Sequence, residues 1–452
     1  MERIKGWKSY QKTLNKRKGK DNRPASFIKY ISILIFAALF LYGFYKLYFY
    51  GNAFLFAGNK KIGGTGIRPI AFIKDKIGGL RLSGFEASGV KSLKSLKKYF
   101  KHNPPIFKTI MNGSYVQKIG KYTVVYTIDP VVQKEAENIF KKYDVPFGVL
   151  AAVEPDTGEV LGFASYSHNE RKSEEISPLF SYPPGSLAKI ITASAAIESS
   201  GFYPGFDICF NGGLYGTDKT FWKQNIGTGK NKISFKQAFA KSCDVAFGKV
   251  AGYYVGGKLL THYFDKFYFN RKIPFILNLE RSKAYIPKRF FQLELTGAGF
   301  KNIKATPLHA ALIAATAING GKMVEPFIIK EIISSSGKII YIHKNVKLLD
   351  RPITEKTAQS LKQMMIATVT KGAAHKNFYN MNDKYMLPGV VSGGKTGTIS
   401  GDNPSGLYQW FAGFGEMKGK KIALSSLVIE KPVWKIGGAG AAEKVIFAYF
   451  FR

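Results

Sequence analysis

Segments with the pattern of β-strands lie at both ends of residues 121–452, and helical patterns fill much of the sequence between them. Near the first end, residues 148–155 and 160–166 are apolar runs separated by the turn Asp-Thr-Gly-Glu, a pattern typical of a β-hairpin. Near the other end, residues 408–416 and 421–430 predict two more strands. Such a sheet must be completed by distant segments. We therefore expect an α+β fold with an antiparallel sheet flanked by helices.

Two helices are predicted beside these strands. Residues 123–129 have the composition of a strand, and a helix at residues 130–143 follows them directly. Asp129 supplies the N-cap of this helix, and Pro130 suits its first position. Residues 441–451 predict a last helix after the final strand.

The charge of the chain limits its possible partners. Lys and Arg number 67 against 30 acidic residues, for a net charge of +37, and more than half of this excess lies in residues 1–120. Such a balance indicates an anionic neighbour, either lipid or nucleic acid. Two cysteines, Cys209 and Cys243, are too few for a disulfide scaffold or a zinc ribbon. We expect them to be free thiols, and we expect no metal and no cofactor.

A membrane anchor is predicted near the start of the sequence. Sixteen residues without a charge lie between Lys29 and Lys46, whereas a helix needs about 20 residues to cross a bilayer core. Apolar sequence continues after Lys46, whose long side chain can reach the interface. We therefore expect a transmembrane helix at residues 30–50. A cleaved signal peptide is the alternative, although no A-x-A-like cleavage site follows.

The charges around the anchor predict its orientation. Residues 1–29 are basic and would form a cytoplasmic tail, which places the rest of the chain outside the inner membrane of a bacterium. Residues 51–120 are rich in Gly and Lys and predict a basic stalk or short pedestal. Their lysine run could contact anionic lipid or polymer, or could be a solvated face. Nucleic acid is excluded as a partner because it would lie across the membrane.

A serine and a lysine at one helix start form the first candidate site. In SYPPGSLAKIITASAAIESSG, the Pro-Pro-Gly segment and Gly201 predict a helix that begins at Ser186. Ser186 would then lie at the positive end of the helix dipole, where free N–H groups stabilise an oxyanion. Lys189 lies one turn further among apolar neighbours. Desolvation there would favour its neutral amine, the form that accepts a proton from a serine hydroxyl.

Two later stretches place polar residues in apolar surroundings. Ser242 interrupts the helical pattern of ISFKQAFAKSCDVAFGKV, 56 residues after the first serine. Lys395, Thr396 and Gly397 lie in VVSGGKTGTIS, which predicts an inner strand of a cleft, paired with residues 408–416, whose glycines let a substrate backbone pass closely. The triplet K-T-G occurs once in the chain, whereas S-x-x-K occurs seven times and is unspecific by itself.

Together the three stretches resemble the active-site signature of penicillin-binding proteins and serine β-lactamases, which is S-x-x-K, then S-x-N, then K-T-G. Their order and spacing match the family, and PPGS, AFAKSCDVAFG and GGKTGT are similar to its flanking sequences. Residues 305–326 also resemble a family helix between the last two motifs. The resemblance covers about residues 121–452 and implies a penicillin-binding fold with an additional, mostly helical subdomain.

The resemblance implies a role for each residue of the first two motifs. Ser186 would be the acylated nucleophile, and Lys189 would be its general base. Ser242 would relay a proton towards the leaving amine. Taken singly, Ser242 could instead be an ordinary helix serine that bonds to the carbonyl four residues earlier.

The third motif would bind the substrate. Lys395 and Thr396 would hold its carboxylate, with Gly397 and Thr398 continuing the same strand. The oxyanion hole would consist of the backbone N–H groups of Ser186 and Thr398. Taken alone, Lys395 could be a surface lysine beside a turn.

One residue departs from the family pattern. Asp244 stands where the second motif usually has Asn. Residues 167–169 (Ser-His-Asn) and 268–270 (Tyr-Phe-Asn) are alternative second motifs, but the first precedes the nucleophile and the second lacks the family's surroundings. An ionised Asp244 would hold Lys189 in its protonated form, whereas a protonated Asp244 would behave much like Asn.

The resemblance leaves several activities open. Residues 51–120 contain one Glu and one Asp and are too few for a glycosyltransferase domain, so a separate glycan polymerase is an expected partner. We expect a membrane-anchored D,D-transpeptidase that cross-links peptidoglycan stem peptides and is inhibited by β-lactam antibiotics. The alternatives are a D,D-carboxypeptidase or endopeptidase with the same acyl-enzyme, a β-lactamase, and a non-enzymatic β-lactam sensor.

Overall fold

The computed structural model describes residues 93–216, 219–222, 229–430 and 435–451. The predicted cytoplasmic tail (1–29), the predicted anchor (30–50) and most of the predicted stalk lie outside these residues. Within the described part of the chain, no helix combines the length and the apolar composition that crossing a bilayer requires.

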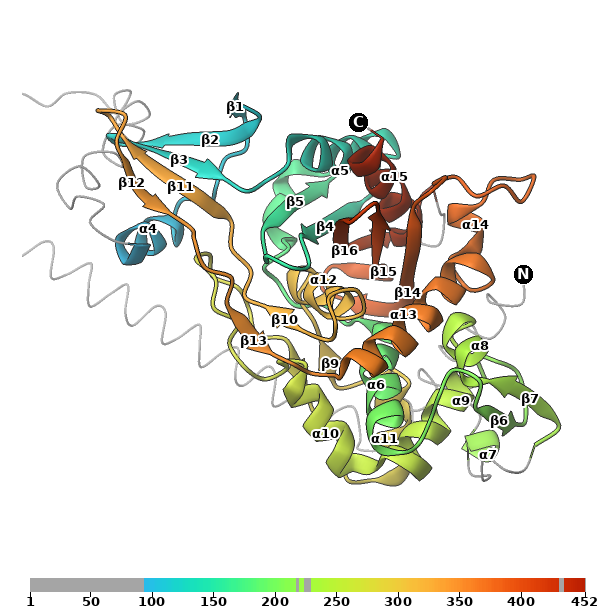
Figure 1. Cartoon of the computed structure of the whole chain (residues 1–452). Coiled ribbons are helices and arrows are strands. Elements are labelled where there is room, and N and C mark those ends of the chain that lie inside the picture. Colours follow the sequence, from blue (N-terminus) through green and yellow to red (C-terminus); the bar gives the residue numbers. More distant parts are fainter. Residues whose placement is uncertain (1–92, 217–218, 223–228, 431–434, 452) are drawn as a thin grey trace, which may run out of the picture. The chain divides into compact units, whose positions relative to one another are not determined.

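The central sheet joins the two ends of the predicted domain (Figure 1). Its five antiparallel strands have the order β14-β15-β16-β4-β5, so the prediction of a sheet completed by distant segments is confirmed. The strands are β14 (Val391–Asp402), β15 (Ser405–Met417), β16 (Lys420–Glu430), β4 (Phe147–Val153) and β5 (Val160–Ser167).

Strand β14 lies at the edge of this sheet, because it pairs only with β15. The prediction of an inner strand was therefore wrong. We expected an inner strand because the sequence of β14 alternates with that of residues 408–416, but the 3₁₀ helix η3 (Gly185–Ala188) and the helix α13 (Glu355–Thr370) cover it instead of a second strand.

Helices cover both faces of the central sheet, and the period of two along each strand separates two hydrophobic cores. Val149, Ala151 and Val153 of β4 contact the core that contains α12 (Pro307–Ala315), within the predicted residues 305–326. Leu150 and Ala152 contact the opposite core, which contains α5 (Pro130–Lys142) and α15 (Gly438–Phe450). The helices predicted at 130–143 and 441–451 are thereby confirmed, as is the Asp129 cap, whose carboxylate accepts from the first backbone N–H groups of α5.

The sequence between β5 and α12 forms a mostly helical part, as the resemblance implied (Figure 1). It consists of α6 (Lys189–Ser199), α7 (Lys219–Trp222), α8 (Phe235–Ala240), α9 (Asp244–Lys249), the π-helix η4 (Val250–Val255), α10 (Gly256–Lys266) and α11 (Phe290–Gly297). The remaining short elements of the described structure are η2 (Glu170–Glu175), α14 (His375–Phe378), β6 (Asp207–Phe210), β7 (Asn231–Ser234), β8 (Lys283–Ala284), β9 (Ile303–Lys304), β10 (Met323–Val324) and β13 (Leu348–Asp350).

A second five-stranded sheet has the order β1-β2-β3-β11-β12. Its strands are β1 (Thr109–Met111), β2 (Ser114–Ile119), β3 (Tyr122–Tyr126), β11 (Ile329–Ser334) and β12 (Ile339–Ile342), and α4 (Leu93–Phe100) packs against it. The strand predicted at residues 123–129 is confirmed as β3, but it belongs to this sheet.

The predicted boundary between residues 120 and 121 is corrected by this sheet. It falls in the turn between β2 and β3, which pair from Val116–Val125 to Ile119–Tyr122. The described part of the predicted stalk therefore folds together with the sequence that follows it. The lysines of α4 and β2 suggested a stalk, but Leu96 and Phe100 between them are buried against the sheet.

Candidate active site

Ser186 lies in a tight turn before a buried helix. The 3₁₀ helix η3 contains it, and α6 continues directly from Lys189, so the predicted helix start is confirmed. Gly185 adopts φ +55°, a conformation that glycine adopts without strain. A Cβ atom at Gly185 would lie 3.2 Å from the backbone N of Thr398. The turn therefore brings the half-exposed Ser186 beside strand β14.

Lys189 is fully buried and directs its ammonium nitrogen at three polar side chains. Its Nζ lies 2.7 Å from Ser186 Oγ, 2.5 Å from Asp244 Oδ1 and 3.4 Å from Ser242 Oγ. The ring of Phe247 lies 5.9 Å from the same nitrogen. Lys189 therefore joins the first motif to the second.

The second motif forms a loop between two short helices. Ser242 follows α8 with φ +57°, and Asp244 is the first residue of α9. A non-glycine residue with positive φ is strained by about 1–2 kcal/mol, and such strain concentrates at functional sites. The loop is fixed by the backbone N–H of Asp244, which donates to Leu214 O at 2.8 Å. Ser242 is thus a loop residue, and the reading as an ordinary helix serine was wrong.

Lys395 enters the site from β14. It is fully buried, and its Nζ donates to Ser242 Oγ and to Thr396 O, both at 2.9 Å. The Ser242 hydroxyl therefore accepts hydrogen bonds from the two lysine side chains, Lys189 and Lys395. The reading of Lys395 as a surface lysine is wrong, because its side chain is inaccessible to water.

The rest of the third motif lies against the nucleophile turn. A Cβ atom at Gly397 would collide with the carbonyl oxygen of Pro184, so only glycine allows this approach. Thr396 and Thr398 are two residues apart on β14 and lie on the same face of the strand. Thr396 is half-buried and Thr398 is exposed, so solutes can reach this face.

Several supporting contacts were not predicted from the sequence. The indole N–H of Trp410 donates to Pro183 O at 2.8 Å and fixes the segment before the nucleophile. Gly299, with φ +95°, lies so close to Gly185 O that any side chain would collide with it. The sequence signal for Trp410 was only its place in a predicted strand, and the Gly-Ala-Gly around residue 298 carried no signal by itself.

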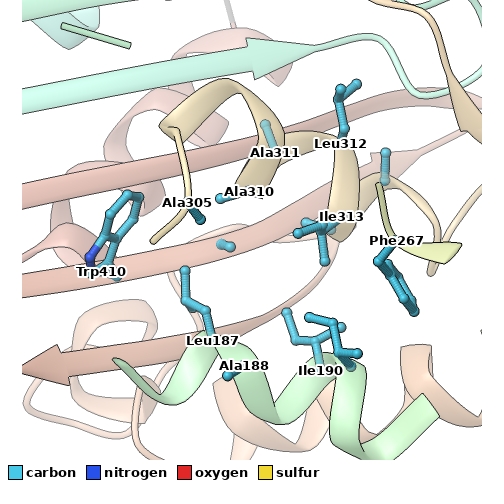
Figure 2. Packing of buried hydrophobic residues seen from close by; sticks show 14 of the residues in the cluster. Leu187, Ala188, Ile190, Phe267, Ala305, Ala310, Ala311, Leu312, Ile313 and Trp410 are labelled. Atoms are coloured by element: carbon cyan, nitrogen blue, oxygen red, sulfur yellow. The ribbon is translucent and has the colours of Figure 1, made fainter. Parts of the chain in front are cut away.

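The helix that carries Lys189 rests on an apolar layer (Figure 2). Leu187 and Ile190 point towards Ile313 of α12, and Trp410 borders the same layer. Thr192 donates to Gly297 O at 2.8 Å and so ties α6 to α11. Because buried side chains are close-packed, this layer holds Ser186 and Lys189 in register with the other motifs.

The two alternative second motifs lie elsewhere. Ser167 ends β5, at the edge of the sheet opposite to β14, and its hydroxyl donates to Asn169 O. The side-chain amide of Asn270 bonds to the backbone of Ala284 at 2.9 and 3.0 Å. Neither segment contacts Lys189 through a hydrogen bond in the described structure. The geometry therefore favours Ser242 and Asp244.

The described residues offer no cluster of His, Cys, Asp and Glu side chains that could hold a metal ion. Both cysteines are free thiols, as expected, with Cys209 half-buried and Cys243 buried. Burial raises the pKa of Cys243 to about 12. Although Cys243 lies between Ser242 and Asp244, it is therefore a neutral thiol and a poor nucleophile.

Sequence comparison agrees with this geometry. The family model of the penicillin binding protein transpeptidase domain matches residues 148–450, which include all three motifs. The chain belongs to this family. Asp244 is therefore a departure from the usual Asn in a true family member.

Two curated relatives show how far the similarity extends. Stage V sporulation protein D of Bacillus subtilis is 27% identical over 294 residues, which are 62% of this chain and 44% of that protein. Peptidoglycan D,D-transpeptidase PbpA of Mycolicibacterium smegmatis is 26% identical over 341 residues, which are 67% of this chain and 66% of that protein. The chain thus spans between 44% and 66% of the length of these relatives.

Solved structures share the fold. Penicillin-binding protein A from M. tuberculosis, in an imipenem acyl-enzyme complex, matches with a TM-score of 0.60 and 24% identity, over 72% of this chain and 79% of that one. Its ceftriaxone acyl-enzyme complex matches with a TM-score of 0.61 over 85% of this chain and 89% of that one. The α+β fold with antiparallel sheets and helices is thereby confirmed.

Proposed function

We propose that this protein is a penicillin-sensitive peptidoglycan D,D-transpeptidase that works through a serine acyl-enzyme. The observation that carries this proposal is the short contact between the half-exposed Ser186 hydroxyl and the buried Lys189 amine, 2.7 Å apart. Ser242 and Lys395 extend it into one connected set of hydrogen bonds. The relatives named as D,D-transpeptidases support the choice of substrate.

Acylation requires a proton to leave Ser186 as its oxygen attacks. The Oγ atom bonds to the carbonyl carbon of the terminal D-Ala-D-Ala peptide bond, and its proton passes to the free amine of Lys189. Ser242, which accepts from Lys189, then relays a proton to the nitrogen of the leaving D-Ala. The C–N bond breaks, and an ester of Ser186 remains.

The third motif binds and polarises the substrate. Lys395 supplies a fixed positive charge for the substrate carboxylate, and the Thr396 hydroxyl lies on the accessible face of β14. Gly397 permits the close approach that brings the backbone of Thr398 beside the nucleophile turn. The N–H groups of Ser186 and Thr398 then stabilise the oxyanion, an effect worth about 3–4 kcal/mol per donor in such sites.

Resolution of the ester decides the product. In the proposed transpeptidase reaction, the amine of a neighbouring stem peptide attacks the ester carbonyl and loses its proton to the Lys189 and Ser242 pair. The new amide bond cross-links the two peptides, the ester C–O bond to Ser186 breaks, and Lys189 returns a proton to the Ser186 oxygen. If water attacks instead, the enzyme is a carboxypeptidase.

We also propose a location. The basic residues 1–29 and the apolar residues 30–50 support a single membrane anchor, with the transpeptidase domain on the extracytoplasmic side of the inner membrane. We also propose that a separate enzyme supplies the glycan strands whose stem peptides this protein cross-links.

The nucleophile is tested by labelling with fluorescent penicillin. We expect one covalent adduct in intact-protein mass spectrometry, at Ser186, and none in Ser186→Ala. Ser177→Ala serves as the control, since Ser177 precedes the site and contacts Tyr182 instead. An adduct that persists in Ser186→Ala would overturn the assignment.

The reaction is tested with peptidoglycan pentapeptides. We expect cross-linked dimers together with equimolar D-Ala when an acceptor amine is present. Release of D-Ala without dimers, at every acceptor concentration, would identify a carboxypeptidase. Penicillin binding without any turnover would identify a sensor.

A further inference from the structure

Exposed apolar side chains concentrate in one small part of the molecule. We call residues 95–126 and 329–348 the basic lobe; they include most of α4 and the strands β1, β2, β3, β11 and β12. Of the 17 large hydrophobic residues that are exposed in the described structure, eight lie in this lobe, each between 40% and 57% exposed. They are Ile106, Ile110, Met111, Ile339, Ile340, Ile342, Val346 and Leu348.

The strand register places some of these residues on one face of the sheet. Val116, Val125, Glu331 and Ile342 are partners in successive strands and form one row across it. Ile342 at one end of the row is 43% exposed, whereas Val116 and Val125 are buried, at 8% and 5%, although they belong to neither of the two hydrophobic cores. The opposite face carries Tyr115 and Tyr126, which pack in the core with α4. The row is therefore open to solvent only at its β12 end, where Ile342 lies beside the half-buried Glu331.

The charged side chains of the lobe are almost all positive. It contains ten exposed lysines, namely Lys97, Lys98, Lys101, Lys108, Lys118, Lys121, Lys330, Lys338, Lys344 and Lys347. Glu331 is its only acidic residue, and it contains no arginine. Four of these lysines, at 330, 338, 344 and 347, lie on or beside β11 and β12 and flank the exposed isoleucines.

This composition fits lipid better than protein. Protein interfaces are enriched in aromatic residues and arginine and depleted of lysine, whereas the exposed residues here are isoleucine and lysine. Surfaces that bind anionic membranes combine apolar side chains, which enter the headgroup region, with lysines, which contact phosphate. For the lysine run at residues 91–102 we considered contact with anionic lipid or a solvated face. The apolar side of α4 packs on the sheet, so this helix cannot insert its apolar side chains into a membrane.

The position of the lobe in the sequence agrees with such a role. It is the first described part of the chain after the apolar segment at residues 30–50. If that segment is a membrane anchor, as proposed above, the lobe is the part of the fold that the chain connects to the membrane by the shortest path.

We propose that the basic lobe docks on the surface of an anionic phospholipid bilayer, with the β12 side of its sheet in the headgroup region. Ile339, Ile340 and Ile342 enter this region, and Lys338, Lys344 and Lys347 bind phosphate groups. Docking at this surface fixes the orientation of the transpeptidase domain relative to the membrane.

The test uses the full chain and measures the depth of a spin label. In a Cys209→Ser background, a nitroxide is attached at Ile342→Cys and, as a control, at Met381→Cys, whose side chain is fully exposed outside the lobe. Vesicles contain either phosphatidylglycerol with phosphatidylcholine, or phosphatidylcholine alone. The collision rates of the label with oxygen and with a water-soluble nickel complex report its environment.

In the vesicles that contain phosphatidylglycerol, we expect the label at 342 to collide at least about fivefold less with nickel, and more with oxygen, than in vesicles of phosphatidylcholine alone. The label at 381 should remain accessible to nickel in all vesicles. A label at 342 that behaves like the one at 381 would overturn the proposal. So would equal protection at 342 in both vesicle types and in detergent, since that would show a protein surface over the sheet.

A charge reversal separates lipid binding from folding and activity. Lys338→Glu, Lys344→Glu and Lys347→Glu together should restore nickel access at position 342, while the rate of penicillin acylation stays unchanged. Continued protection in this variant would overturn the proposed role of the lysines. Because acylation is measured separately, failure of lipid docking and failure of the proposed transpeptidase are distinguishable.

Discussion

The active site and the basic lobe both contain lysines, but the two regions place them in opposite surroundings. In the site, Lys189 and Lys395 are fully buried and bonded to named side chains and carbonyls. In the lobe, the lysines are exposed and the apolar side chains are exposed with them.

The difference shows how one residue type serves two purposes. A buried ammonium is expensive unless it is paired, so the site must supply Asp244 and two serine hydroxyls at short range. An exposed ammonium needs no partner and interacts with anything anionic at long range. Position in the fold, more than residue identity, therefore decides which lysine acts on a substrate.

The largest contrast is expected from removing one lysine in each region. Lys189→Met deletes the proposed general base, so the acylation rate with penicillin should fall about 10³-fold. Lys344→Met in the lobe should leave the acylation rate unchanged, because that side chain is exposed and takes no part in the hydrogen bonds of the site. Rates are measured by stopped-flow with fluorescent penicillin, and circular dichroism confirms folding. An equal fall in the acylation rate of the two variants would show that the buried lysine has no special role in acylation.

A second contrast uses one glycine from each region. Gly397→Ala forces β14 away from Pro184 O, and we expect acylation to fall about 100-fold, or about 2.7 kcal/mol. Gly113→Ala, in the turn between β1 and β2, has open space but φ +75°. It should lower the free energy of unfolding by about 1 kcal/mol and leave acylation unchanged. Normal acylation in Gly397→Ala would show that the close approach is dispensable.

Glu430 is a buried carboxyl without a buried lysine partner, so it tests whether a buried charge is costly when it is unpaired. Glu430 is 4% exposed and accepts from the Gln409 amide at 3.1 Å, and burial raises its pKa to about 7 from 4.5. The folded state therefore binds this proton more tightly than the unfolded chain. The free energy of unfolding should fall by about 2–3 kcal/mol from this group as pH rises from about 4.5 to about 7.

Glu430→Gln should remove that part of the pH dependence. Urea unfolding at pH 5 and pH 8 measures it, and the variant should gain stability over the parent protein only at pH 8. A variant that is equally affected at both pH values would contradict the assignment.

The smallest effect is expected at the residue that departs from the family. Asp244→Asn replaces the carboxylate 2.5 Å from Lys189 Nζ with a neutral amide, so the lysine loses a charged partner that competes with Ser186 for its hydrogen bonds. We expect acylation by penicillin to be roughly tenfold faster, about 1.4 kcal/mol, measured by stopped-flow with fluorescent penicillin. Glu331→Gln, the matching change in the lobe, should have no effect. A rate unaltered by Asp244→Asn would show that the contact between Asp244 and Lys189 does not limit the attack by Ser186.

Short-range sequence patterns predicted the parts of the fold that depend on local physics. The Asp129 cap, the β4–β5 hairpin and the helix start at Ser186 follow from capping, turn and breaker residues within a few positions. The motif residues were predicted by resemblance, and the structure places Ser186, Lys189, Ser242, Asp244 and Lys395 within hydrogen-bonding distance of one another in a connected chain.

Long-range pairing explains what the sequence left unresolved. β14 reads as a buried strand, but its cover is a helix start rather than a second strand. β3 joins β11, whose residues lie about 200 positions later, so its sheet could not be assigned locally. The contact of Trp410 with Pro183 spans 227 positions and has no local signature.

The strand order of the central sheet has a consequence for how the chain is made. Val153 of β4 pairs with Ala423 of β16, 270 positions later, so the β4–β5 hairpin is synthesised long before its partner. An isolated hairpin is marginally stable in water, and its unpaired edge is a template for wrong associations. Non-local pairing of this kind also slows folding. The central sheet therefore remains incomplete until β16, the last described strand, has emerged, and any truncation before Lys420 leaves an open sheet that is prone to aggregation.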